Sequence, residues 1–238
     1  EELSAHVPRT NPLVRHQIFT LHHALAQIYL DRGQLALGQR HRKIASELAS
    51  ELLTLSPEDP DIRRHAAFGW KLNADVLAAE GDFVSALDEL ARAEAMFRSL
   101  WADNLADERV QYDLALLLFK KGKCQRLSGE RDPSLATYMA AAQILSGLRM
   151  MQPQRPEYLL ELARITTEPA VWYLGQKSPD GDGQASTLLD QAESTLGLIL
   201  DSTHDLHDAI SRLRASIEGN RQIITSRSSK RHQNSDAD

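Results

Sequence analysis

The chain has 238 residues, of which 42% are hydrophobic and 25% are charged, and its formal net charge is −6. This composition is that of a folded globular protein, so wholesale disorder is excluded. The acidic balance argues against a sequence-independent nucleic-acid binder, because such proteins need clustered Lys and Arg to neutralise phosphates.

Targeting signals and disulfides are also absent from the sequence. No apolar run approaches the roughly 20 residues that a membrane-spanning helix needs, and the N-terminus lacks a signal-peptide pattern. A single cysteine, Cys124, excludes an intrachain disulfide. We therefore expect a cytoplasmic protein that does not enter a membrane. The opening Glu1-Glu2 without methionine is consistent with a piece of a longer chain.

The first predicted elements are two helices joined by a tight turn. Residues 1–12 carry prolines and little periodicity, so they are expected to form a lead-in segment. Apolar residues at helical spacing predict a helix over 13–30, and Gly33 stands where a helix C-terminus needs a residue free to adopt positive φ. A second apolar stripe predicts a helix over 35–55. Asp59 and Pro60 are expected to cap and begin the next helix.

The turn glycine marks an internal repeat. Gly33, Gly81 and Gly129 stand 48 residues apart, and each lies between two predicted helices. A fixed period of this length predicts stacked helix-turn-helix repeats. We place them at about 13–60, 61–108, 109–156 and 157–200. In the third repeat, Asp132 and Pro133 are expected to cap and begin the second helix.

The fourth repeat departs from this pattern. Pro169 falls inside its first helix and predicts a kink near Glu168, while residues 178–183 are expected to enlarge the turn. A final apolar stripe predicts a capping helix over 202–224, because the last member of a stacked array has one side in water. Residues 225–238 lack an apolar anchor, so we expect a disordered tail.

The small and large residues within each repeat carry a family resemblance. The second repeat shows the pattern at these positions: Trp70, Ala74, Leu77, Gly81, Phe83, Ala86, Leu90 and Ala93. This pattern resembles the tetratricopeptide repeat. The small pairs that would let the helices approach closely are Ala26 with Gly38, Ala74 with Ala86, and Gly122 with Ser134. The family's usual period is 34 residues, so a period of 48 adds about two turns to each helix.

The resemblance implies an all-α fold. It would be a right-handed α-solenoid of stacked repeats with a C-terminal capping helix, forming a single domain over 13–224. The long period is similar to that of C-terminal arrays in bacterial signalling and defence proteins.

In the family, first-helix residues that face away from the second helix line a concave groove that binds a protein or peptide partner. By position, this implies the following candidates: His23, Gln27, Lys71, Asp75, Phe119, Lys123, Arg126 and Arg164. Asp75 replaces the asparagine with which some relatives, together with a lysine, clamp a C-terminal carboxylate, so chaperone-tail binding is not expected.

The leading interpretation is therefore a non-enzymatic interaction or scaffold module, without a cofactor, that forms part of a larger signalling or defence protein. One alternative is a metal-dependent enzyme that uses His204 and His207 with neighbouring acids, although a capped, solvated helix start explains the same cluster. Another is an RNA-binding helical repeat. The sequence contains no catalytic triad, phosphate-binding loop or activated cysteine in a supporting setting.

Overall fold

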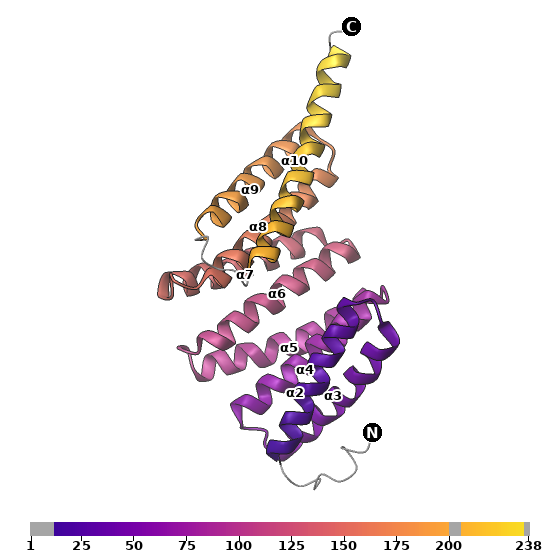
Figure 1. Cartoon of the computed structure of the whole chain (residues 1–238), viewed down its shortest axis with the longest axis vertical. Coiled ribbons are helices and arrows are strands. Elements are labelled where there is room, and N and C mark those ends of the chain that lie inside the picture. Colours follow the sequence, from indigo (N-terminus) through magenta and orange to yellow (C-terminus); the bar gives the residue numbers. More distant parts are fainter. Residues whose placement is uncertain (1–11, 200–205, 236–238) are drawn as a thin grey trace. The chain divides into compact units, whose positions relative to one another are not determined.

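The structure is a computed structural model, which describes residues 12–199 and 206–235. These residues contain helices and no strand, which confirms the predicted all-α helical-repeat class (Figure 1). The helices are α2 (Pro12–Asp31), α3 (Leu35–Leu55), α4 (Pro60–Ala79), α5 (Phe83–Asp103), α6 (Glu108–Ser128), α7 (Arg131–Met151), α8 (Pro156–Gly175), α9 (Pro179–Gly197) and α10 (His207–Ser235).

The helix starts keep the 48-residue period throughout. The first helices begin at residues 12, 60, 108 and 156, and the second helices begin at residues 35, 83, 131 and 179. The fourth repeat therefore has no enlarged turn, and the expectation for residues 178–183 is wrong. Pro179 begins α9, and the Ser178 hydroxyl accepts a hydrogen bond from the Gly181 N–H. Pro169 lies within α8, which continues to Gly175.

A left-handed residue marks each turn inside a repeat. Gly33, Gly81 and Gly129 have φ of 70°, 85° and 90°, and Lys177 takes the fourth position with φ of 55°. Each glycine follows a helix whose last turn closes through a bond from the next N–H to the carbonyl five residues earlier, as from Asp82 to Leu77 at 2.9 Å. The sequence pattern did not predict that Lys177 forms the fourth turn, because the other three turns were recognised by their glycine.

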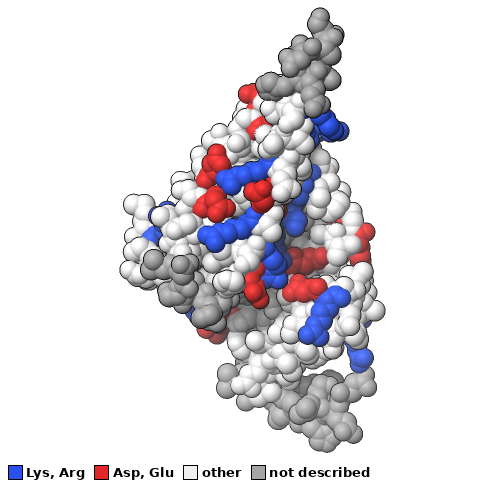
Figure 2. Space-filling model, turned by 45° about the horizontal axis from the view of Figure 1, so that its top comes forward, with Lys and Arg blue, Asp and Glu red and all other residues white. Residues whose placement is uncertain are grey.

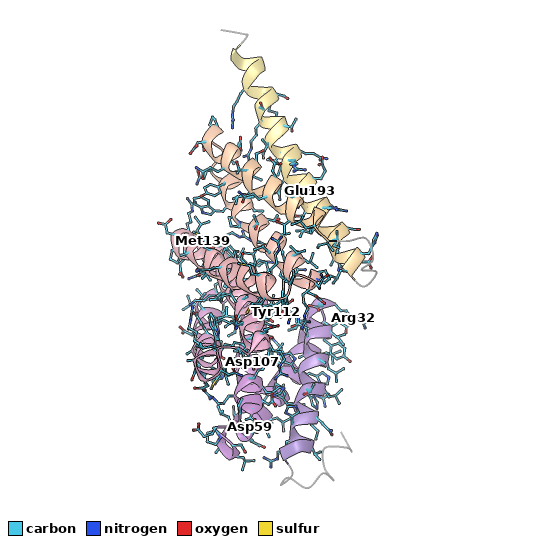
Figure 3. All side chains as sticks on the ribbon, turned by 90° about the vertical axis from the view of Figure 1, so that its left-hand side faces the viewer. Arg32, Asp59, Asp107, Tyr112, Met139 and Glu193 are labelled. Carbon is cyan, nitrogen blue, oxygen red and sulfur yellow. The ribbon has the colours of Figure 1, made fainter. Side chains whose placement is uncertain are left out.

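Acidic caps start the helices at two repeat boundaries. Asp59 Oδ1 accepts from the N–H groups of Asp61 and Ile62, as predicted. Asp107 does the same for α6, and both residues are labelled in Figure 3. The predicted cap at Asp132 is wrong. α7 begins one residue earlier, at Arg131, and Asp132 lies in its first turn. There its negative charge interacts favourably with the positive end of the helix dipole.

The helices group into two compact units, whereas we expected a single domain. Unit 1 runs to Leu117 and includes Leu127–Gly129, and unit 2 takes Leu118–Arg126 and the chain from Glu130 onward. In unit 1, α2 packs on α3, α3 on α4 and α4 on α5, and α2 also contacts α4. Its core includes Phe19, Ala49, Leu52 and Ile62.

Unit 2 has a second core, in which α8 packs on α7 and α9 and α10 packs on both α8 and α9. The small pair Gly122 and Ser134 lies here, and the Ser134 hydroxyl donates to the Gly122 carbonyl at 2.8 Å. An added Cβ at Gly122 would lie 2.8 Å from the Tyr138 ring. The predicted close approach of this helix pair is therefore confirmed.

The last helix extends well past its predicted end at residue 224. α10 continues to Ser235, so residues 225–235 are helical where we expected a disordered tail. Asp182, which is 4% exposed, accepts from Arg227 and Arg231 at 2.9 and 2.6 Å. Arg227 also donates to the Leu174 carbonyl. These long-range bonds anchor a segment that has no apolar stripe, which is why composition alone misled the prediction.

Candidate partner-binding surface

The predicted groove residues of unit 1 lie on its two first helices, α2 and α4. His23, Gln27, Lys71 and Asp75 are all half-buried. The His23 ring centroid lies 5.8 Å from that of Phe68, and Lys71 Nζ lies 5.8 Å from the same Phe68 centroid. The structure thus brings His23 and Lys71 together around one aromatic ring.

Sequence reasoning missed Phe68, which lies at the centre of this surface. Its ring is half-buried and packs edge-on against Phe97 at 5.6 Å. The Arg64 guanidinium lies 4.9 Å from the ring centroid. Phe68 stands 48 residues after Thr20 and 96 before Arg164, both of which occupy the outward first-helix position. The repeat phase was therefore a sufficient signal, although an aromatic residue suggested core packing.

A buried ion pair fixes Arg64 beside Phe68. Arg64 Nε donates to Asp113 Oδ2 at 2.5 Å, and Asp113 is only 8% exposed. Burial raises the pKa of Asp113, and the bond to Arg64 opposes that rise. The charges of Lys71 and Arg109 act on Asp113 in the same direction as Arg64. The guanidinium is thus held in place rather than free to swing into solvent.

Two histidine rings, His23 and His65, also lie near the Phe68 ring, at 5.8 and 6.5 Å. The rings of His16 and His65 meet edge-on at 4.1 Å, and Phe19 contacts both His65 and His23. Burial lowers the pKa of His65, and the neighbouring His16 lowers it further. A second pair, His22 and His41, places its Nδ1 atoms 2.8 Å apart, so one ring donates and the other accepts. Burial also lowers the pKa of His22, so the folded state favours the uncharged imidazoles of His22 and His65.

In unit 2, two of the four predicted residues form ion pairs within the unit. Arg126 lies 3.3 Å from Glu168, and Arg164 lies 3.3 Å from Glu161. Phe119 packs against Tyr138, with ring centroids 6.0 Å apart, whereas Lys123 is exposed. Burial raises the pKa of Tyr138 to about 12. These residues form no cluster comparable to that around Phe68.

Unit 2 also carries an open depression of about 680 Å³ bounded by α7, α8 and α9. Its lining combines Leu162 and Leu198 with polar residues such as Thr166, Thr187 and Gln191. It contains none of the predicted groove residues. On the face that Figure 2 shows, basic and acidic side chains are interspersed rather than segregated by sign.

The metal-enzyme alternative rests on residues that are mostly outside the described part of the chain. His204 lies there, and so do Asp201, Ser202 and Asp205. Within residues 12–199 and 206–235, no three His, Cys, Asp or Glu side chains are grouped so as to hold a metal ion. Cys124 is buried and forms no disulfide. No helix in this part of the chain has the length and apolar character to cross a membrane.

Comparisons with known proteins add little to this description. No family model matches the chain. No curated protein matches it either. Among solved structures, a de novo designed helical repeat protein has 14% sequence identity and a TM-score of 0.31, over 92% of this chain and all of that chain. The periodic helix pairs described above define the chain as a helical-repeat protein.

Proposed function

We propose that the chain is a non-enzymatic protein-interaction module that binds a peptide segment of a partner on unit 1. The binding surface, which we call the α2–α4 strip, consists of His23, Gln27, Phe68, Lys71 and Asp75. One observation carries the proposal: the half-buried ring of Phe68 on α4 contacts His23 on α2, and cationic groups lie beside it.

Within the strip, Phe68 is the residue that packs against the core of unit 1, next to the buried Phe97. Close packing within the helix pairs uses Ala26, Ala74 and Ala86, which are buried. The strip residues are half-exposed and chemically mixed. A flat aromatic ring flanked by hydrogen-bonding groups is the kind of anchor that dominates the energy of protein interfaces.

The chemistry of the strip favours a particular kind of peptide. Phe68 offers a surface for an apolar or aromatic anchor, while Lys71 provides positive charge for an acidic neighbour. Asp75, one turn beyond Lys71 on α4, would repel a terminal carboxylate. We therefore propose an internal segment in which an acidic residue lies close to an apolar anchor.

The proposal is tested by selecting binders from a random peptide library on the immobilised chain and measuring their affinity by calorimetry. Phe68→Ala should weaken the selected peptides by about tenfold or more, as expected for a central anchor. Lys71→Glu should weaken acidic peptides selectively. Val84→Ala, an apolar truncation of a side chain that is 73% exposed on α5, is the matched control and should have no effect.

Circular dichroism of each variant separates lost binding from lost folding. If Phe68→Ala destabilises the chain, Lys71→Glu alone must still change the affinity. Selected peptides that bind both variants as tightly as the native chain would show that the strip is not the binding surface. Salt-sensitive binding of unstructured RNA, lost in Lys71→Glu, would instead favour the RNA-binding alternative.

A further inference from the structure

The first helix of the first repeat has an apolar face that the described elements leave partly uncovered. Val14, Ile18, Leu21, Leu25 and Ile28 follow one another at steps of four and three residues, which places them on one stripe of α2. Leu21 is 57% exposed and Ile28 is 46% exposed. The opposite side of α2 is the one that packs into unit 1, through Phe19 and Ala26.

The same positions are buried in the other repeats. The residues one, two and three periods after Leu21 are Gly69, Leu117 and Ile165, and each is buried. The residues one and two periods after Ile28 are Val76 and Cys124, and both are buried. Among the four first helices of the described residues, α2 is thus the only one in which the residues at the Leu21 and Ile28 positions are both exposed.

What covers these positions elsewhere is the second helix of the preceding repeat. α3 packs on α4, and its Ala49 lies against Gly69, where an added Cβ would come within 3.4 Å. α7 packs in the same way on α8. There the large residues Leu162 and Ile165 lie three full periods after Ile18 and Leu21 of α2. The partner that suits α2 is therefore a helix like α7, that is, the second helix of a repeat, which packs on the first helix of the next repeat.

The flanks of the stripe also suit a helix rather than water. Residues 16–30 contain no Asp, Glu, Lys or Arg. A terminal repeat that faced solvent would carry a polar outer face. α10, at the other end of the described chain, carries polar exposed residues, which include Arg212, Ser216 and Glu218.

From this comparison the geometry points to the α2 stripe as a docking surface for an amphipathic helix of the second-helix type, supplied from outside these 238 residues. Such a helix would cover Leu21 and Ile28 as α3 covers the corresponding face of α4. The apolar area removed from water would provide the driving force.

An in-phase extension of the full chain tests this surface. A second copy of residues 108–155 is joined directly to Pro12 in place of residues 1–11, so that Arg155 precedes Pro12 as it precedes Pro156 in the native chain. In a Cys124→Ala background, Ile28→Cys should react readily with a maleimide in the native chain. In the extended chain its labelling should slow by about tenfold or more, because reaction then requires local opening.

Leu21→Glu provides the decisive comparison. It should leave the unfolding midpoint of the native chain unchanged but lower that of the extended chain, where Leu21 becomes buried. Val84→Glu on α5 is the matched control and should be neutral in both chains, because Val84 is exposed in both.

Three outcomes would overturn the inference. The first is labelling of Ile28→Cys at the same rate in both chains. The second is an extension that adds no helical circular dichroism, which would mean that α2 does not accept such a helix. The third is a native chain that light scattering shows to be a dimer dissociated by Leu21→Glu, since the occupant would then be a second copy.

Discussion

At the scale of single residues, the protonation of two histidines should affect the free energy of unfolding. His22 and His65 both have a pKa below the usual value of 6.5, chiefly because they are partly buried. His41 and Arg40 lower the pKa of His22 further, as His16 and Arg64 do for His65, whereas Asp61 acts in the opposite direction on His65. In the unfolded chain both imidazoles would take up protons more readily than in the folded chain.

We therefore predict that acid destabilises unit 1 through these histidines. Between the lowered pKa values and 6.5, the unfolded state binds more protons, so the free energy of unfolding rises with pH. This contribution is complete above pH 6.5 and is lost as the pH falls below it. Urea unfolding at a series of pH values between about 5 and 8 measures the slope.

The control for this prediction is the double variant His22→Gln, His65→Gln, which should show a smaller slope than the native chain. The carboxyl groups of Asp113 and Glu161 have raised pKa values and contribute a slope of opposite sign at lower pH. They are retained in both proteins, so the difference between the two slopes isolates the histidines. Equal slopes would contradict the assignment.

At the scale of the elements, small residues decide how closely the helices approach. Gly122 and Gly147 both lie inside helices, in α6 and α7. An added Cβ at Gly122 would meet the buried Tyr138 ring at 2.8 Å, whereas at Gly147 it would meet nothing within 4 Å. Substitution at Gly122 therefore tests the packing between helices, whereas substitution at Gly147 tests helix propensity alone.

The same substitution should have opposite effects at these two sites. Gly122→Ala should lower the free energy of unfolding by about 1–3 kcal/mol, because the Tyr138 ring must shift in a packed core. Gly147→Ala should raise it by about 0.5–1 kcal/mol, since alanine favours a helix interior. Chemical denaturation of both variants measures the difference. A stabilising effect at Gly122 would mean that the two helices are less closely packed than described.

The C-terminal helix gives a second prediction at this scale. Asp182→Asn should weaken the attachment of residues 227–231 and lower the free energy of unfolding by about 1.5–3 kcal/mol, the range for a hydrogen bond to a charged group. The arginines are partly exposed and can recover water, so the upper end is not expected. Hydrogen exchange should quicken in the last turns of α10. Asp190→Asn, which affects the exposed pair with Arg221, is the control.

At the scale of the whole molecule, the sequence predicted the arrangement of the helices better than it predicted the contacts at the candidate binding surface. The helix pairs, their 48-residue spacing and the Asp59 cap were predictable because they depend on short-range features. Gly81, for instance, permits a left-handed turn wherever it stands. The fourth turn was misplaced because Lys177 adopts the same conformation without glycine, which only the surrounding helices could impose.

The candidate site was predicted less well. His23 and Lys71 were named from their phase, but Phe68, to which both are adjacent, was not. In unit 2, Arg126 and Arg164 were predicted to face a partner, and each lies beside an acidic residue of its own unit. Phase identifies the side of the helix on which a residue lies, but it does not identify the neighbour that it meets.

By itself the sequence determined the fold class, the period and the bounds of the first two helices to within one residue, because helix propensity, capping and turn conformation act between residues close in the chain. Only the tertiary structure decided that Phe68 meets His23, that Arg64 meets Asp113, and that Asp182 retains α10 as a helix through Ser235. These pairs lie 45 to 49 residues apart. Contacts at such separations depend on how complete helices pack, which periodicity does not specify.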